Sequence, residues 1–500
     1  MPLVAWHYGA MKHLFALGLT ATTTLLCLTP PARASSALEM LGAPTGGNAL
    51  TARLFSHNAG AAYFNPALLP DATFKLEAGF FGLVTRGRIR LKSRPAGVDV
   101  PAAVYDPELS FSGPRPIATQ DLANPRSDTD EDDHVLYAVV GLVRPLAGKY
   151  LVFGFYSLLP VNSFLDQKGF FADEREQYFS NKLYFEQLGD RASATSFAFA
   201  LGSQLNDWLS VGAGIDIAVV TQSNTSVYMP DAGNQQNVLL NPDIHTNSKF
   251  KPYLGVVYRP SPRVSIAATL HLGTSNDTFG QNQVRVRNDT SQYPPGLDYI
   301  PQTYVLTQGN EPARLGLGAS LSSRRQVENG RAAWEVGLVA VAERWSQYRD
   351  RHGESPLDTW HDTVTVVAGG NFAWRQRRLA FDLGYVPSPV PDQTGRTNYV
   401  DNSRIVSSAS IESPVNLLGR EIEAGVYLFG SVFVPRSVDK DLNRTDANKL
   451  VDEFPDSTVN NLTHLPDPRA AGLQTNNPGY PGFSSSGYML GLGVCLRIAR

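Results

Sequence analysis

Apolar and polar residues alternate with a period of two along many segments of this chain. In one such segment Phe74, Leu76 and Phe80 fall on one face, whereas Lys75 and Glu77 fall on the other. Successive side chains of a β-strand point to opposite faces, so this alternation predicts strands with two different environments. We place about 14 strands near residues 72–91, 134–144, 150–160, 193–205, 208–222, 249–259, 263–274, 312–322, 332–346, 360–374, 377–387, 403–412, 417–434 and 487–498.

The lengths of the connections distinguish a barrel from a soluble sandwich. Short links follow every even-numbered strand, as at residues 146–149 and 375–376, and long links follow the odd-numbered strands, as at residues 92–133, 161–192 and 435–486. Strict alternation of this kind is typical of outer-membrane barrels, which have tight periplasmic turns and long external loops. The sequence therefore predicts an all-β fold, a transmembrane antiparallel β-barrel with both termini on the periplasmic side. A further strand could lie within residues 275–311.

Residues 1–34 have the pattern of a secretory signal peptide. An apolar run over residues 14–28 follows Lys12, and Ala32-Arg33-Ala34 forms a small-residue cleavage site. An N-terminal membrane anchor is the alternative, and Met11 is an alternative start to Met1. After this segment no run approaches the ~18 apolar residues of a transmembrane helix, which leaves a closed barrel as the way to cross an outer membrane.

Charge and composition narrow the remaining functions. The formal net charge of −3 disfavours nucleic acid as a partner, and with Cys27 in the signal peptide Cys495 has no disulfide partner. The acidic run at residues 128–133 could bind calcium, but we interpret it as a solvated loop; residues 439–443 open like a calcium loop that Arg444 then breaks. We expect no cofactor and no metal.

No sequence motif for hydrolysis is found. The chain has neither a Gly-x-Ser-x-Gly elbow nor a His-Glu-x-x-His zinc motif. Its histidines are scattered, so a Ser-His-Asn arrangement assembled by folding stays an alternative to our expectation that the protein is not an enzyme.

Small residues are dense at the start of the mature chain. Residues 47–53 and 59–67 end in an Asn65-Pro66-Ala67 turn directly before the first predicted strand, and such residues let a backbone fold into a confined space. This stretch resembles the N-terminal plug of the outer-membrane channels for hydrophobic compounds, the long-chain fatty-acid and toluene channel family. The resemblance implies a plug (hatch) at residues 35–71 inside a barrel formed by residues 72–500.

Further stretches carry the same resemblance in the family's order, at residues 251–260, 312–319, 343–348, 385–392 and 400–404. The chain departs from the family pattern at three places: Asn58 stands where Asp is common, Leu68 stands where Gly is common, and the C-terminus is not aromatic. The resemblance implies passive, diffusion-driven uptake of hydrophobic small molecules, long-chain fatty acids or aromatic hydrocarbons. External loops would capture them, an inner pocket would bind them, and they would leave sideways through the barrel wall.

Candidate site residues lie in the plug and in one long loop. Residues 174–188 lack Gly and Pro, are rich in aromatic residues and read as a helix in a capture loop, although these side chains could instead pack the loop onto the barrel rim. We predict that the plug turn acts in gating through Asn58, Asn65, Pro66 and Ala67. The candidate ligand-binding residues are Phe64, Leu68, Leu69, Phe170, Phe171, Tyr178, Phe179, Leu183, Tyr184 and Leu188.

The expected partners are a hydrophobic small-molecule ligand and the lipid and lipopolysaccharide of a Gram-negative outer membrane, with the protein a monomer. Two alternatives stay open. A general porin for polar solutes would need an open, charged lumen, and a surface-binding barrel would use its long loops without transporting anything.

Overall fold

The computed structural model describes the N-terminal segment, the strands and several connections. The described residues are 37–72, 74–91, 128–161, 183–184, 195–229, 239–286, 299–323, 333–349, 355–356, 358–374, 377–393, 398–417, 420–439 and 482–499. Among these residues no helix is long and apolar enough to cross a membrane.

Fourteen of the strands coincide with the fourteen segments predicted from the alternation. They are β1 (Phe74–Leu91), β2 (Asp128–Pro145), β3 (Val152–Pro160), β5 (Ser196–Asn206), β6 (Leu209–Met229), β7 (Leu239–Ser261), β8 (Val264–His271), β11 (Arg314–Ser322), β12 (Trp334–Glu343), β13 (Thr363–Trp374), β14 (Arg377–Val386), β16 (Arg404–Leu417), β17 (Arg420–Asp439) and β18 (Gly482–Ala499).

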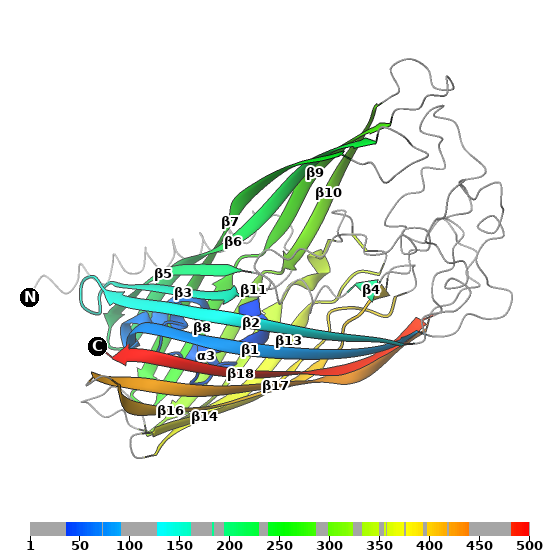
Figure 1. Ribbon diagram of the computed structural model, residues 1–500. Helices are drawn as coiled ribbons and strands as arrows, with labels where there is room; N and C mark the ends of the chain where they lie inside the picture. The colour runs from blue at the N-terminus through cyan, green and yellow to red at the C-terminus, as the bar shows by residue number, and fades with distance from the viewer. Residues whose placement is uncertain are drawn as a thin grey trace, which may run out of the picture.

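These strands close into a barrel (Figure 1). Each pairs antiparallel with the next, β18 returns to pair with β1, and the long β6–β7 ladder completes the ring. Closure satisfies the backbone hydrogen-bonding groups of every strand, as a barrel in lipid requires. The predicted antiparallel barrel of about 14 strands is confirmed.

Two additional strands lie in the region where the sequence left room for one. β9 (Thr274–Val286) and β10 (Tyr299–Glu311) form a hairpin, and β9 pairs in parallel with the outer part of β6 at residues 225–229. Figure 1 shows β6, β7, β9 and β10 flaring away from the barrel as one sheet. The long connection after β8 is therefore largely β-structure.

Two local predictions are wrong. The acidic run at residues 128–133, interpreted as a solvated loop, forms the start of β2, where the register places Asp128 opposite Arg90 and Asp132 opposite Arg86. The backbone is thus held by the extended end of β1. The predicted helix at residues 174–188 does not include Leu183–Tyr184, which forms β4 and pairs in parallel with β15 (Asn398–Tyr399); the rest of that prediction lies outside the described residues.

An aromatic cluster packs beside β15. It begins at η3 (Trp345–Gln347), the short 3-10 helix that follows β12. The rings of Tyr348 and Trp360 stack with 3.7 Å between their centroids. Trp345 and Tyr399 complete the cluster, which joins the connections after β12 and β14 into one folded unit.

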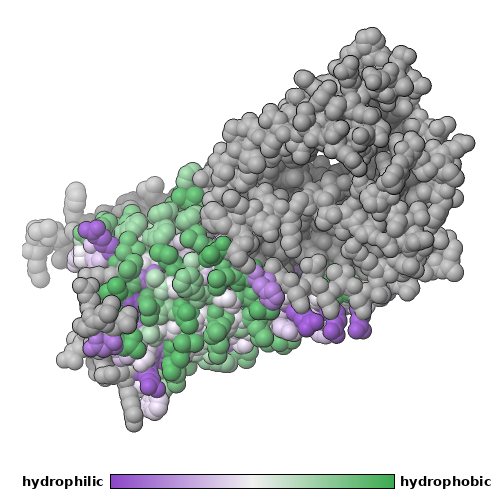
Figure 2. All heavy atoms as spheres, in the orientation of Figure 1, coloured by the Kyte–Doolittle hydropathy of each residue, from purple (hydrophilic) through white to green (hydrophobic). Residues whose placement is uncertain are grey.

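The two faces of the barrel wall differ as the alternation requires. On β18 Leu490, Leu492 and Leu496 are about half exposed, whereas Met489 and Arg497 on the opposite face are buried. Figure 2 shows hydrophobic residues gathered over the outer face of the barrel that is turned to the viewer. The outer face therefore has the character of a surface in contact with lipid, and the inner face holds the core and the charged groups.

The N-terminal segment (residues 37–72) is folded and buried within the ring of strands. It comprises α2 (Ala37–Leu41), α3 (Ala52–Phe55), α4 (Ala61–Phe64) and the 3-10 helix η1 (Pro66–Asp71). Tyrosines from strands far apart in the ring bind its backbone: Tyr427 of β17 donates to the Leu41 carbonyl at 3.0 Å, and Tyr253 of β7 donates to the Ala62 carbonyl at 2.5 Å. Contacts from such separate strands mean that this segment lies inside the barrel.

Candidate functional site

The Asn-Pro-Ala turn joins α4 to η1 and is fixed by its own side chain. Asn65 is fully buried; its Oδ1 accepts from the Ala67 amide at 3.1 Å, and its Nδ2 donates to the Arg53 carbonyl at 2.9 Å. Pro66 occupies the first position of η1, where its missing N–H costs nothing. Asn65 therefore ties η1 to α3 as well as shaping the turn.

Asn58 shapes the preceding turn in a similar way. Its Oδ1 accepts from the Gly60 amide at 2.9 Å and from the Ser56 hydroxyl at 3.0 Å. The next amide, that of Ala59, donates to Oε2 of Glu77 on β1 at 3.1 Å. An asparagine fills both acceptor roles that an aspartate would fill here, without adding another charge beside Glu77.

Glycines in the wall let the N-terminal segment approach closely on one side of the barrel. A Cβ added to Gly255 of β7 would lie 2.1 Å from Oδ1 of Asn65, and one added to Gly212 of β6 would lie 2.4 Å from the Pro66 backbone. Similar overlaps would arise with Leu69 at Gly154 and with the Pro66 carbonyl at Gly202. We call this region, formed by β3 and β5–β7 against η1, the close-packed side.

Hydrogen bonds and charges hold the segment on the other side. Asp382 of β14 is fully buried and accepts from the Leu50 backbone amide at 3.0 Å, the Asn48 side-chain Nδ2 at 3.0 Å and the Thr51 hydroxyl at 2.7 Å. Its fourth donor is Ser408 of β16, at 2.8 Å. All four groups can donate to this carboxyl, so Asp382 is the acceptor that seats residues 48–51 against the wall.

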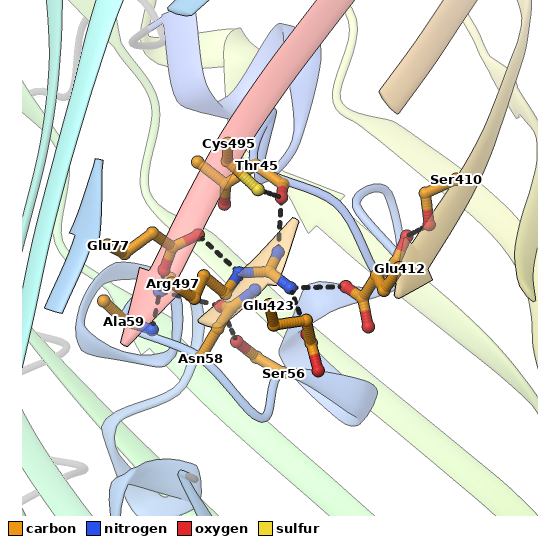
Figure 3. A network of polar contacts seen from close by, with 12 residues as sticks. Thr45, Ser56, Asn58, Ala59, Glu77, Ser410, Glu412, Glu423, Cys495 and Arg497 are labelled. Atoms are coloured by element: carbon orange, nitrogen blue, oxygen red, sulfur yellow. Dashed lines mark hydrogen bonds and ion pairs between the residues drawn. The ribbon is translucent and has the colours of Figure 1, made fainter. Parts of the chain in front are cut away.

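Arg497 of β18 forms the centre of a second polar cluster on this side (Figure 3). Its guanidinium pairs with Glu77 at 3.2 Å, Glu412 at 2.7 Å and Glu423 at 3.0 Å, and it also donates to the Thr45 carbonyl. The Cys495 thiol donates to the same carbonyl at 2.5 Å. Strands β1, β16, β17 and β18 are thus joined to the segment at Thr45. We call the region of Asp382 and Arg497 the hydrogen-bonded side.

Glu39 of α2 lies in a third charged group. Its carboxylate accepts from Arg53 at 2.6 Å and lies 3.9 Å from Arg314 of β11, which itself pairs with Glu343 at 2.8 Å. Burial by itself would raise the pKa of Glu39, but the charges of Arg53 and Arg314 outweigh it and hold that pKa well below its ordinary value of 4.5. Glu39 is therefore charged at neutral pH.

A small cavity of about 60 Å³ lies between the N-terminal segment and the wall at β12–β14 and β16–β18. Its apolar lining residues include Met40, Leu50 and Phe64 from the segment and Val341, Val367, Val386, Val406, Phe429 and Met489 from the wall, and polar groups form about half of its surface. Glu39, Arg53, Glu343, Arg404 and Ser431 also reach it. A cavity that combines apolar side chains with polar groups can hold a small molecule and fix its orientation.

The candidate residues from the sequence fall in three places. Phe64 lines this cavity, whereas Leu68 and Leu69 are buried in η1 away from it. The structure brings Asn58, Asn65, Pro66 and Ala67 together in the segment, as hydrogen-bonded turn residues. Leu183 and Tyr184 form β4, and Phe170, Phe171, Tyr178, Phe179 and Leu188 lie outside the described residues.

Sequence reasoning missed the wall residues of the site, above all Asp382, Arg404 and Arg497. A signal was present in the sequence, because each of these charged residues occupies a position of its predicted strand whose side chain points to the inside of the barrel. The alternation predicts the strands and their two faces, and it does not by itself show which inward charges meet the N-terminal segment.

No protein-family model and no curated protein sequence matches the chain. Among solved structures it is similar to a FadL homologue of Pseudomonas aeruginosa, with 16% identity, 93% of this chain and 98% of that chain covered, and a TM-score of 0.51. Similarities to the toluene transporters TodX of Pseudomonas putida (12% identity, 91% and 99% covered, TM-score 0.42) and TbuX of Ralstonia pickettii (12%, 93% and 98%, 0.42) are weaker. The chain therefore shares the fold of the FadL homologue, and the resemblance inferred from the sequence is confirmed at the level of the fold.

Proposed function

We propose that this protein is an outer-membrane channel for the passive uptake of hydrophobic small molecules. The observation that carries the proposal is the cavity, lined by both apolar and polar side chains, between the buried N-terminal segment and the barrel wall. The shared fold with a FadL homologue and the apolar outer face of the barrel support the same function and an outer-membrane location. Neither nucleotide nor ion gradient enters the scheme, because the ligand moves down its own concentration gradient.

In this proposal the N-terminal segment is the plug that the sequence suggested. A cavity of about 60 Å³ is far below the ~300 Å³ or more that encloses a drug-sized ligand, so a long acyl chain enters only if the segment shifts. Sideways exit through the wall would then transfer the ligand into membrane. Because an apolar ligand would not return to water on this route, it would keep the favourable burial free energy of ~25 cal/mol per Å² of apolar surface.

The two alternative functions place different requirements on the interior of the barrel. A porin for polar solutes needs an open, charged passage, and here a segment with a continuous apolar core occupies the barrel. A surface-binding barrel would need only its external connections. We therefore favour uptake of fatty acids or aromatic hydrocarbons over either alternative.

The test is uptake of labelled oleate and labelled toluene by liposomes that contain the purified protein, with glucose as the polar control. Uptake of a hydrophobic compound without glucose is the expected result. Glucose passage through the unmodified protein would favour a porin, and no transport of any compound would favour the surface-binding barrel.

Two sets of variants assign roles within the channel. Asn65→Ala removes the tie between η1 and α3 and should change the uptake rate, whereas Asn416→Ala, at an exposed end of β16, should not. Tyr178, Phe179 and Leu183 changed together to Ala should reduce uptake if the loop captures ligand. Unchanged uptake in the triple variant would remove the loop from the proposal.

A further inference from the structure

The outer face of the barrel changes from apolar to basic along β1. Phe80 and Val84 are exposed on this face, and Arg86, Arg88 and Arg90 follow on the same face and are exposed as well. Because alternate residues of a strand point to one face, the three arginines stand in a line directly beyond the apolar positions. We call them the arginine row. It lies at the end of β1 that leads into the long connection to β2, which is the external end of a barrel with short periplasmic turns.

The neighbouring strand β18 locates the edge of the apolar band. From Leu490 to Ile498 its outward residues are apolar and exposed, and Tyr488 is the next outward residue toward the external end. At ~3.3 Å per residue Tyr488 and Ile498 are about 33 Å apart along the strand, which is about 25 Å in height at a strand tilt of about 40°. An apolar band of about 25 Å bordered by aromatic residues is typical of outer-membrane barrels. Tyr488 therefore marks the level of the membrane interface.

The arginine row begins at this level. The register pairs Arg86 with Tyr488 and places Ser486 and Ser484 opposite the other two arginines. Figure 1 shows β1 beside β18, and Figure 2 shows hydrophilic residues at both ends of the hydrophobic band. Guanidinium groups and serine hydroxyls both donate hydrogen bonds. The surface thus presents donors to an anion where the apolar band ends.

Acidic residues of β2 lie on the other side of the arginine row. The register places Asp132, Asp130 and Asp128 opposite the three arginines. A guanidinium carries five N–H donors and a bidentate pair with a carboxylate uses two of them, so an arginine beside an aspartate keeps donors for a phosphate. The aspartates also lower the overall charge of this surface. Binding of an anion would therefore depend on direct contact with the arginines and not on a general positive field.

A groove lies on the outer face next to the arginine row. Its volume is about 820 Å³ and its exposed surface is mainly apolar. Gly82 of β1 and Gly430 of β17 lower the wall here, because neither has a side chain, and Leu490 of β18 lies between these strands. Val84 also lines the groove and is the neighbour of Arg86 on the same face. The groove therefore reaches from the apolar band to the start of the arginine row.

We propose that this surface binds a phosphorylated lipid of the outer leaflet, with its phosphate on the arginine row and one acyl chain in the groove. Lipopolysaccharide, whose lipid A part carries phosphates and several acyl chains, has this chemistry. Arginine and phosphate form charge-assisted, bidentate hydrogen bonds, and an acyl chain gains dispersion contacts in a groove that it fills. An uncharged lipid or a second copy of this chain would fill the groove without using the arginine row. The inference rests on the proposed outer-membrane location and is independent of uptake.

The head-group test measures binding of diphosphoryl and monophosphoryl lipid A to the detergent-purified protein by native mass spectrometry. The variants are Arg86→Gln, Arg86→Lys and a triple variant with the whole arginine row changed to Gln. Arg144→Gln is the matched control, because Arg144 is exposed on the outer face of β2 at its opposite, short-turn end. Circular dichroism follows the thermal unfolding of each variant.

We expect Arg86→Gln to weaken binding of diphosphoryl lipid A about two- to fivefold and the triple variant to weaken it about tenfold or more. Arg86→Lys should keep part of the affinity, and Arg144→Gln should change it less than about twofold. Monophosphoryl lipid A should bind more weakly than the diphosphoryl form. Added salt should weaken binding to the unmodified protein more than to the triple variant, because exposed charges are screened.

The acyl-chain test fills the groove. A Cβ at Gly82 has its nearest neighbour at 4.0 Å, so Gly82→Leu places a side chain in open space and should weaken lipid A binding without lowering the unfolding midpoint. Ala78→Leu is the matched control, because Ala78 is exposed on the same face of β1 outside the groove. Excess inorganic phosphate should not displace the lipid, because it has no chain to occupy the groove.

Three outcomes would overturn the lipid site. They are affinity of the triple variant within twofold of the unmodified protein, equal effects of Gly82→Leu and Ala78→Leu, and displacement of the lipid by inorganic phosphate. Any of these with hydrophobic uptake intact would leave the proposed channel standing. Lipid A binding without uptake in the liposome assay would instead refute the channel and keep the lipid site.

Discussion

Replacing Asp382 by alanine should release residues 45–51 of the N-terminal segment from the barrel wall. Three donors of the segment, on Asn48, Leu50 and Thr51, converge on this one carboxylate. A hydrogen bond to a charged group contributes about 1.5–3 kcal/mol, and one left unmade in a buried place incurs a desolvation penalty. Even at the lower limit, three such bonds amount to about 4.5 kcal/mol of local stability.

Cys495 provides a reporter for that release. Its thiol lies 4% exposed beneath Thr45, to whose carbonyl it donates, so it reacts with a maleimide only when residues near Thr45 move away. If opening and closing are fast relative to the reaction, the labelling rate follows the population of the open form. A loss of about 4.5 kcal/mol corresponds to a rate increase of at least about a thousandfold, since 1.4 kcal/mol is a factor of ten.

The assay is maleimide labelling of native protein in detergent, with the peptide that contains Cys495 quantified by mass spectrometry. Asp382→Asn should give an intermediate rate, because the amide keeps one acceptor oxygen and directs an N–H₂ group at the remaining donors. Asp392→Ala is the control, because that carboxylate is 79% exposed and its pair with Arg436 contributes little. A labelling rate for Asp382→Ala within threefold of the unmodified protein, with β-content unchanged, would refute the reasoning.

Three further outcomes follow from the same contacts. Gly255→Val should lower the thermal midpoint, because overpacking the close-packed side costs about 1–3 kcal/mol. Gly82→Val should leave the midpoint unchanged, because a Cβ at Gly82 faces open space with its nearest atom at 4.0 Å. Equal midpoints for the two variants would contradict this expectation. Arg497→Met leaves three carboxylates without their cation and should destabilise by about 3–5 kcal/mol in denaturant titrations, against about 1 kcal/mol or less for Arg436→Met. The pKa of Glu39 is lowered in the folded protein, so its ion pair stabilises the fold above pH 4.5 and loses that contribution as the pH falls below 4.5. Glu39→Gln should therefore make the thermal midpoint depend less on pH below 4.5. An unchanged pH dependence would exclude this ion pair as its cause.

The strands of the barrel could be predicted because their two faces meet different environments. β18 alternates from Met489 to Arg497 as one parity faces outward and the other faces the core, and that difference is recorded locally in the sequence. β9 and the first residues of β2 lie in the flared or extended ends of the sheet and lack such alternation. Residues 274–283 hold a single apolar residue, Phe279, so pairing with neighbouring strands and not a local pattern fixes their structure.

The site could be predicted only in part, because its contacts join distant residues. The Asn65 turn and Phe64 were found from a local run of small residues. By contrast, Asp382 and Thr51 are 331 residues apart, and Cys495 and Thr45 are 450 apart. The parity of a strand shows which charges point inward, but only the assembled barrel shows that Arg497 pairs with three carboxylates and that no described carboxylate pairs with Arg404.

The two sides of the N-terminal segment should respond differently when a ligand enters. On the close-packed side the wall glycines meet Asn65, Pro66 and Leu69 directly, and moving these residues away would open a dry void whose cost rises with its volume. On the hydrogen-bonded side, separation exchanges protein partners for water or for polar groups of the ligand, and each exposed bond then costs only about 0.5–1.5 kcal/mol net. The cavity lies on the hydrogen-bonded side, where the lining strands run from β12 to β18. Displacement by a ligand would therefore begin at residues 45–51 and pivot on η1, and this is the movement that Cys495 beneath Thr45 is placed to report.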